Sequence, residues 1–184
     1  GARSGQAAAS NQPVSYAEAT FAGDAAQYPF HFLPYASIQF YDGSAAHLPW
    51  LQELPGPMTS AMWSSWVELN PQTAAKLSIA QGDIVVIAST VGAVRSPVFI
   101  NPGLAPDIVA MPVGQGHSTY TRYASGRGQN PVEIIAPVAE AATGALAWAA
   151  TRVKVTRVGD PDGKLILFSA AGELREKPFE LEKR

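Results

Sequence analysis

Short apolar runs, rich in β-branched residues and separated by turn residues, recur along the chain. Runs of this length and composition predict short buried or half-buried strands rather than long helices. Their number, six to seven, predicts a small β-barrel and not a βαβ arrangement. The predicted strands span residues 28–35, 84–88, 94–100, 107–112, 151–158 and 164–169.

Turn signals connect several of these predicted strands. The sequence Val91-Gly92-Ala93 predicts a hairpin between residues 84–88 and 94–100. Residues 159–163 (GDPDG) predict a turn between the last two strands. Pro97 lacks a backbone N–H, so we expect it at a strand edge or a bulge.

Helical signals are few and short. Asn70 and Pro71 fit a helix N-cap and first helical position, so residues 72–77 are predicted to form a short helix. Residues 132–135 fit either a helical turn or a strand. Residues 42–66 and 114–130 are predicted to be long loops, and the first carries three tryptophans that must pack against something. The predicted class is therefore mainly β, a six-stranded barrel with one or two short helices and long loops.

The two ends of the chain differ from its middle. Residues 1–27 show no periodic pattern and are predicted to be a linker or irregular arm, whereas residues 28–170 contain the barrel. Residues 171–184 are highly charged and are predicted to be a linker or tail. Both ends resemble continuing chain, so we expect a module of a longer protein.

Composition excludes several functions. The net charge of −2, with scattered basic residues, argues against nucleic-acid binding. Without cysteine, the chain supplies no iron–sulfur ligand or disulfide. No run approaches the roughly 20 apolar residues of a membrane span. Only 15% of residues are charged. We expect either that alanine-rich segments such as residues 139–150 inflate the apolar count, or that partners cover much of the surface.

Residues 66–116 carry a specific combination of motifs. An NP-x-x-A-x-x-L-x-I-x-x-GD-x-V segment is followed by an S-x-x-G hairpin and a PG-x-x-PD-x-V turn. This combination resembles the C-terminal molybdopterin-dinucleotide-binding domain of the molybdopterin oxidoreductases, and the likeness extends over about residues 28–158. It implies a six-stranded double-psi β-barrel. The matching residues are Asn70, Pro71, Ala74, Leu77, Ile79, Gly82, Asp83, Val85, Ile87, Ser89, Gly92, Pro102, Gly103, Pro106, Asp107 and Val109.

Two further segments narrow the resemblance. Residues 49–71 are similar to the polysulfide-reductase branch, and residues 114–131 to the large peripheral iron–sulfur subunit of alternative complex III. The resemblance implies a cofactor-free, non-catalytic scaffold domain in a membrane-bound, quinol-oxidising complex, on the periplasmic side. Its implied partners are an iron–sulfur region or subunit, a multihaem cytochrome c and quinol-binding membrane subunits. The alternative is a cofactor-binding domain of a polysulfide- or thiosulfate-reductase-like molybdoenzyme that holds molybdopterin guanine dinucleotide.

The loop Gly114-Gln115-Gly116-His117 is the sharpest candidate site. In relatives of this family the corresponding loop faces the pterin, and glycines let backbone amides approach a ligand. In the competing interpretation, the glycines fix barrel geometry and the polar groups satisfy one another. Arg122, with Arg127, is a candidate for anion binding or for carboxylates across an interface.

Other residues give weaker signals. The three histidines show no catalytic or metal-ligand spacing, so we expect no catalytic or metal-binding residue in this chain. His31 is expected to lie in the core or at its rim. Residues 37–47 contain no arginine or lysine, which argues against a bound pyrophosphate unless backbone amides serve instead. The three tryptophans of residues 42–66 (Trp50, Trp63 and Trp66) are expected to pack in a core or interface rather than relay electrons. A stand-alone ligand-binding barrel is the third hypothesis.

Overall fold

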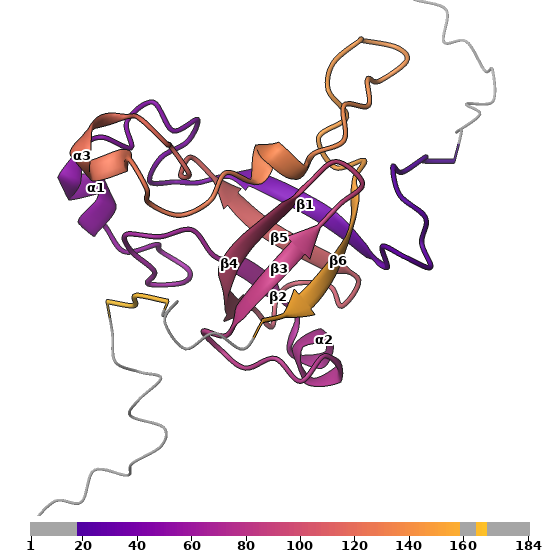
Figure 1. Ribbon diagram of the computed structural model, residues 1–184, viewed down its shortest axis with the longest axis horizontal. Coiled ribbons are helices and arrows are strands. Elements are labelled where there is room, and N and C mark those ends of the chain that lie inside the picture. The colour runs from indigo at the N-terminus through magenta and orange to yellow at the C-terminus, as the bar shows by residue number, and fades with distance from the viewer. Residues whose placement is uncertain (1–17, 159–164, 169–184) are drawn as a thin grey trace, which may run out of the picture.

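The computed structural model describes residues 18–158 and 165–168. Six strands close into a barrel in the order β1-β5-β2-β4-β3-β6 (Figure 1). Two neighbouring pairs, β1 with β5 and β2 with β4, are parallel, and the other four pairs are antiparallel. The strands are β1 (Phe30–Ala36), β2 (Val67–Leu69), β3 (Ile84–Ala88), β4 (Ala93–Ile100), β5 (Ile108–Val113) and β6 (Arg152–Arg157).

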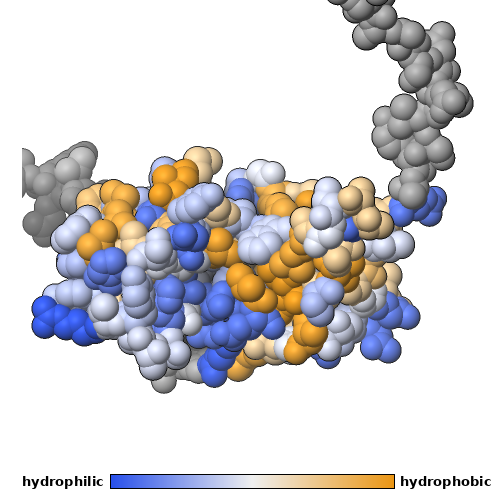
Figure 2. All heavy atoms as spheres, turned by 90° about the horizontal axis from the view of Figure 1, so that it is seen from above, coloured by the Kyte–Doolittle hydropathy of each residue, from blue (hydrophilic) through white to orange (hydrophobic). Residues whose placement is uncertain are grey.

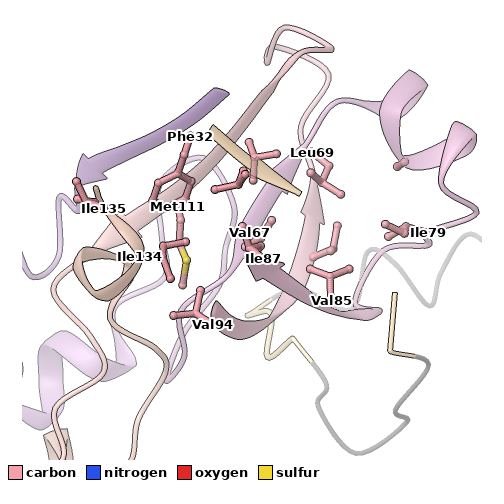
Figure 3. Packing of buried hydrophobic residues seen from close by; sticks show 14 residues of the cluster. Phe32, Val67, Leu69, Ile79, Val85, Ile87, Val94, Met111, Ile134 and Ile135 are labelled. Atoms are coloured by element: carbon pink, nitrogen blue, oxygen red, sulfur yellow. The ribbon is translucent and has the colours of Figure 1, made fainter. Parts of the chain in front are cut away.

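The barrel encloses one apolar core. Every strand contributes fully buried side chains at alternate positions, as expected where one face of each strand points inward. One end of the core is covered by Ile134 and Ile135, and the other by Ile79 beside α2 (Pro71–Lys76) (Figure 3). The inward-facing residues include Phe32, Val67, Leu69, Val85, Ile87, Val94, Val98, Val109, Met111 and Val153.

The predicted six-stranded barrel is confirmed, and so is the β3–β4 hairpin. The predicted helix at residues 72–77 is α2, capped by the Asn70 side chain, which accepts a hydrogen bond from the N–H of Gln72 at 2.7 Å. Residues 132–135 form a helical turn, η1 (Pro131–Ile134), and not a strand. His31 lies half-buried at the rim, edge-on to the Phe21 ring at 4.4 Å.

The strand prediction for residues 164–169 is wrong where the structure describes them. Of residues 165–168, only Leu167 forms an isolated bridge, antiparallel to Ala61. Strand β6 pairs instead with β1 and β3, which occupies both of its edges and closes the barrel. The predicted turn at residues 159–163 lies outside the described residues. The sixth strand is β2, which no pattern in the sequence predicted.

Both predicted long loops contain a short helix. α1 (Pro49–Glu53) interrupts the first loop and α3 (Thr121–Ala124) the second, so the helices outnumber the one or two expected. The alanine-rich residues 139–150 stay outside the core and are mostly exposed, so they do inflate the apolar count. In the part of the chain that the structure describes, no helix is long and apolar enough to cross a membrane.

Pro97 lies inside β4, opposite Ile84 of β3. The neighbouring Val98 donates its N–H to the carbonyl of Asp83. Because successive residues of an antiparallel strand direct their polar groups to opposite sides, the Pro97 nitrogen faces away from β3. On that side the pairing with β2 begins only at Val98. Pro97 therefore lies where this side of β4 has no partner strand, the local edge position that the sequence predicts, and no donor is needed there.

A buried carboxylate, Glu68 of β2, joins several elements on the outer side of the barrel. It accepts hydrogen bonds from the hydroxyl of Tyr35 on β1, from the indole of Trp66 at 3.0 Å and from the amide of Asn101 at 2.7 Å. Burial, followed by the adjacent Glu68 carboxylate, raises the pKa of Tyr35 well above its ordinary value. Three neutral donors thus hold a carboxylate that is 6% exposed.

Candidate functional site

An open cleft lies between the turn after β1, the loop after β5 and the start of η1. Its volume is about 570 Å³, and a neighbouring hollow of about 280 Å³ shares several of its walls. The loop Gly114–His117, predicted as a site, lines this space. Residues lining one or both hollows include Asp42, Gly43, Ser44, Gly116, His117, Tyr120, Asn130, Val132, Glu133 and Trp148.

The glycines of this loop bring protein segments together. Gly116 has φ +91°, and a Cβ there would collide with the backbone of Gln129 and Asn130. Gly114 has φ +110°, and a Cβ there would lie 2.6 Å from Cβ of Phe40. These conformations favour glycine. The close approaches are to other loops, which supports the interpretation that the glycines fix the geometry around the barrel.

Gln115 turns inward and pairs with another glutamine. Its side-chain amide donates to Oε1 of Gln52 at 2.7 Å, and the Gln52 amide donates back at 3.1 Å and to the carbonyl of Ala46 at 2.8 Å. Both glutamines are buried. The pair links the loop after β5 to α1, which lies beside α3 in Figure 1. The donors of Gln115 are therefore directed to the protein rather than into the cleft.

His117 forms part of the polar wall of the cleft. Its Nε2 lies 3.1 Å from the carbonyl oxygen of Gly43. Because a carbonyl oxygen can only accept a hydrogen bond, Nε2 carries the proton in this contact. The ring lies 5.0 Å from that of Tyr120, whose hydroxyl donates to the carbonyl of Ser44 at 2.7 Å. These contacts fasten the loop after β5 to the turn after β1. They provide no carboxylate partner of the kind that would orient a catalytic histidine.

Several backbone amides of the cleft are already engaged. The N–H groups of Gly43, Ser44, Gly116 and Tyr120 donate to Phe40, Asp42, Arg127 and Ser125, respectively. A pyrophosphate held by backbone alone needs free N–H groups directed at it. These four are not free.

The charged side chains of the cleft are carboxylates. Asp42 and Glu133 line it, and neither hollow is lined by lysine or arginine. The backbone N–H of Ser44 donates to Asp42 at 2.9 Å and is the main cause that lowers the pKa of this carboxyl. A dinucleotide cofactor carries a pyrophosphate that requires cations or donors. Among the described lining residues there is no lysine or arginine to meet that group, and the side-chain donors are neutral, among them the hydroxyls of Ser44, Ser118 and Thr119 and the amide of Asn130.

Neither of the two candidate arginines is among the lining residues. Arg122 of α3 is exposed, and its guanidinium donates to the hydroxyl of Tyr123 and lies 4.6 Å from the centre of that ring. Arg127 lies 4.8 Å from the centre of the Trp63 ring. The structure thus brings Gly114, Gln115, Gly116 and His117 together at the cleft but leaves Arg122 outside its lining. Whether these residues contact a cofactor stays a prediction.

The tryptophans differ in their surroundings. Trp66 is buried, as predicted, and hydrogen-bonded to Glu68. Trp63 is half-buried beneath Arg127. Trp50 of α1 is 63% exposed, so it does not pack in the core of this chain, and its place in an interface stays a prediction. Within residues 18–158 and 165–168, no group of three or more potential ligand side chains is placed to hold a metal ion.

Sequence reasoning missed several lining residues. Asp42 had a local signal, because Asp-Gly-Ser is a turn sequence in which the side chain accepts from a following N–H. Glu133 and Asn130 had none, since they reach the cleft only through the position of η1. Gln52 was not predicted as a site residue because its segment was interpreted as a loop.

Comparisons with known proteins agree with this fold. The family model of the Molydopterin dinucleotide binding domain, that is, the molybdopterin dinucleotide-binding domain, matches residues 51–148. Among solved structures, acetylene hydratase from Pelobacter acetylenicus superposes with a TM-score of 0.61 at 11% identity, covering 77% of this chain and 21% of that one. This likeness concerns the fold alone.

Curated relatives include proteins named as molybdopterin-type subunits. The chain is 38% identical over 92 residues to the menaquinone reductase, molybdopterin-binding-like subunit of Nitratidesulfovibrio vulgaris, covering 50% of this chain and 13% of that protein. It is 30% identical over 147 residues to ArrA, the molybdopterin-containing subunit of the arsenate respiratory reductase of Shewanella sp. ANA-3, covering 74% and 17%.

A third relative belongs to the tetrathionate reductase of Archaeoglobus fulgidus and is 29% identical over 90 residues, which cover 49% of this chain and 7% of that protein. The chain spans less than a fifth of the length of each of these three relatives. Three observations agree on one family: the closed barrel, the cleft at its loops and a family match over more than half of the chain. The chain belongs to the molybdopterin dinucleotide binding domain family.

Proposed function

We propose that this chain is a cofactor-free scaffold domain of a quinol-oxidising electron-transfer complex similar to alternative complex III. In this proposal the barrel keeps the shape of a molybdopterin domain and performs no catalytic step itself. Its partners are an iron–sulfur region or subunit, a multihaem cytochrome c and quinol-binding membrane subunits. The complex is membrane-bound, and this domain belongs to its peripheral part on the periplasmic side.

The observation that carries the proposal is the donor set of the cleft. The cleft presents Asp42 and Glu133, while the amide of Gln115 and four backbone N–H groups are engaged within the chain. Placing a phosphate beside carboxylates without compensating cations is unfavourable because like charges repel. A domain that itself held the pyrophosphate at this cleft would be expected to present cations there.

The name of one relative supports the same class of complex. The Nitratidesulfovibrio protein is named a molybdopterin-binding-like subunit of a menaquinone reductase. That name supports a quinone-linked assembly for a domain similar to this one. The named direction is reduction, whereas we propose oxidation of quinol. Both directions transfer electrons between a quinone and the complex, and the reduction potentials of the redox partners set which direction is favoured.

The surface of the barrel is also suited to contact with partners. Large apolar side chains remain exposed, among them Ile38 at 81% and Met58 at 86%. One face shows apolar residues gathered beside polar ones (Figure 2). Contiguous exposed apolar patches of this kind commonly belong to protein–protein contact surfaces.

A cofactor-deficient host tests the proposal. The whole assembly would be produced in cells that cannot synthesise molybdopterin and compared with the assembly from the parent strain. We expect the same subunit content and the same quinol-oxidation rate, because no step of the proposed function uses the cofactor. A known molybdoenzyme produced in both strains is the control and should lose its activity. Loss of quinol oxidation in the deficient strain would overturn the proposal.

The alternative function is a cofactor-binding domain in the catalytic subunit of a molybdoenzyme. Similarity to the arsenate and tetrathionate reductase subunits favours it, as does an open cleft at the Gly114–His117 loop. In that case His117 and the polar wall of the cleft would face the pterin, and the rest of the polypeptide would hold the phosphates. The same experiment separates the two, because such an enzyme would lose its activity in the deficient strain.

A further inference from the structure

The two carboxylates of the cleft come from different walls. Asp42 belongs to the turn after β1, and Glu133 belongs to η1, much later in the chain. The fold therefore brings together two negative charges that are unrelated in sequence. Asp42 also borders the adjoining hollow, so both parts of the space have a carboxylate in their lining.

The position of Asp42 is fixed by its own turn. Its Oδ1 accepts the N–H of Ser44, and Gly43, with φ +91°, packs against Gly114 and His117. The N–H of Ser44 holds this exposed carboxyl in place and lowers its pKa, and the carboxyl is ionised at neutral pH even without that shift. This negative charge is thus a built feature of the cleft wall. Among residues 18–158 and 165–168, no lysine or arginine lines the cleft to offset it.

We propose that Asp42 and Glu133 make this cleft anion-excluding, so that it rejects phosphate groups even when a phosphorylated ligand is supplied. This inference rests on the proposed cofactor-free function and adds the residues responsible for it. It assigns them a role in specificity, since they set which charge the cleft admits. The glycines and Gln115 keep the shape of the site, and the two carboxylates determine its selectivity.

Charge reversal tests the assignment, with inorganic pyrophosphate as the probe. The variant Asp42→Lys/Glu133→Lys would be prepared in the whole purified assembly, and binding would be measured by titration calorimetry at low salt. Each reversal is expected to strengthen pyrophosphate binding about tenfold, or about a hundredfold for the pair, at the ranges where exposed charges interact. Because the effect is electrostatic, about 0.5 M salt should remove most of the gain.

A matched control has the same change of net charge outside the cleft. Glu53→Lys/Asp107→Lys replaces two exposed carboxylates that do not line either hollow. We expect less than about a threefold change in pyrophosphate affinity for this control at the same salt concentration. Because other subunits can also bind pyrophosphate, the comparison is between the two variant assemblies and the parent.

A conservative variant guards against misfolding. Asp42→Asn/Glu133→Gln removes both charges but retains an oxygen that can accept the Ser44 N–H. It should give an intermediate gain of about tenfold. Subunit content of each assembly confirms that the chain is folded and incorporated.

Three results would overturn the inference. They are tight pyrophosphate binding at this cleft in the parent, an equal gain in the control variant, and no gain in either cleft variant when both are incorporated. None of these outcomes depends on whether the assembly contains molybdopterin. Cofactor found in the parent assembly would instead overturn the proposed function, so the two failures are distinguishable.

Discussion

Gly116→Ala should destabilise the domain more than any other single-methyl addition in the loop after β5. The glycine has φ +91°, and the added Cβ would lie 2.8 Å from Cα of Asn130 and closer still to the backbone of Gln129. These are backbone atoms that cannot rotate away. The two segments must therefore move apart, which also disturbs the hydrogen bond from the Gly116 N–H to the Arg127 carbonyl at 2.8 Å.

The cost in the free energy of unfolding has three contributions. A left-handed conformation costs a residue with a Cβ about 1–2 kcal/mol. Loss of the backbone hydrogen bond adds about 1 kcal/mol, and the separated loops lose further packing, giving a total of about 3 kcal/mol. For a chain of this size each kcal/mol lowers the melting temperature by about 2–4 °C.

Gly126→Ala is the matched control in the same loop. Gly126 has φ +70°, and a Cβ there would meet nothing within 4 Å, so only the backbone strain of about 1–2 kcal/mol remains. Urea unfolding of the 184-residue chain should therefore show a larger loss for Gly116→Ala, by about 1–2 kcal/mol. Equal losses for the two variants would refute the argument that Gly116 is needed for close packing of the loops.

Three further predictions concern other parts of the fold. Gln115→Leu should lower the free energy of unfolding by about 1–3 kcal/mol because it leaves the buried Gln52 amide without one of its partners. The double variant Gln52→Leu/Gln115→Leu should lose less stability than the sum of the two single variants, and additive losses would contradict the pairing. Tyr35→Phe should leave the ultraviolet titration of tyrosine between about pH 9 and 11 unchanged, because burial and Glu68 keep the pKa of Tyr35 above that window. Since this folded pKa is raised, the stability it contributes is complete below about pH 10 and is lost as pH rises further; a smaller titration amplitude in the variant would contradict the raised pKa. Asn70→Ala removes the cap of α2 and should cost about 0.5–2 kcal/mol in urea unfolding, and an unchanged midpoint would show that the cap is dispensable.

The β3–β4 hairpin was predictable because its information is local. Two β-branched runs flank a turn at Gly92, and the two strands pair with each other. β2 was missed because three residues are too few to show an alternating pattern, and Glu68 interrupts its apolar character. The run at residues 164–169 has strand composition, yet composition does not determine pairing. Both edges of β6 are occupied by β1 and β3, which is a property of the closed barrel.

The candidate site was predictable in part. The sequence Gly114–His117 identified the loop that lines the cleft, and the absence of arginine and lysine from residues 37–47 anticipated its lack of cations. The partner of Gln115 lies 63 residues earlier, in a helix of five residues that gives no clear helical pattern. Glu133 enters the cleft only because η1 packs over one end of the barrel. Such long-range placements depend on the closed fold and leave no local trace.

The central claim is that the barrel retains the shape of a molybdopterin domain without its cofactor. The most direct measurement is the content of molybdenum, tungsten and oxidised pterin per chain in the purified native assembly, with a molybdoenzyme from the same cells as the positive control. The account predicts that metal and pterin stay at background in the assembly and are stoichiometric in the control. One molybdenum or tungsten with its pterin per chain would contradict it.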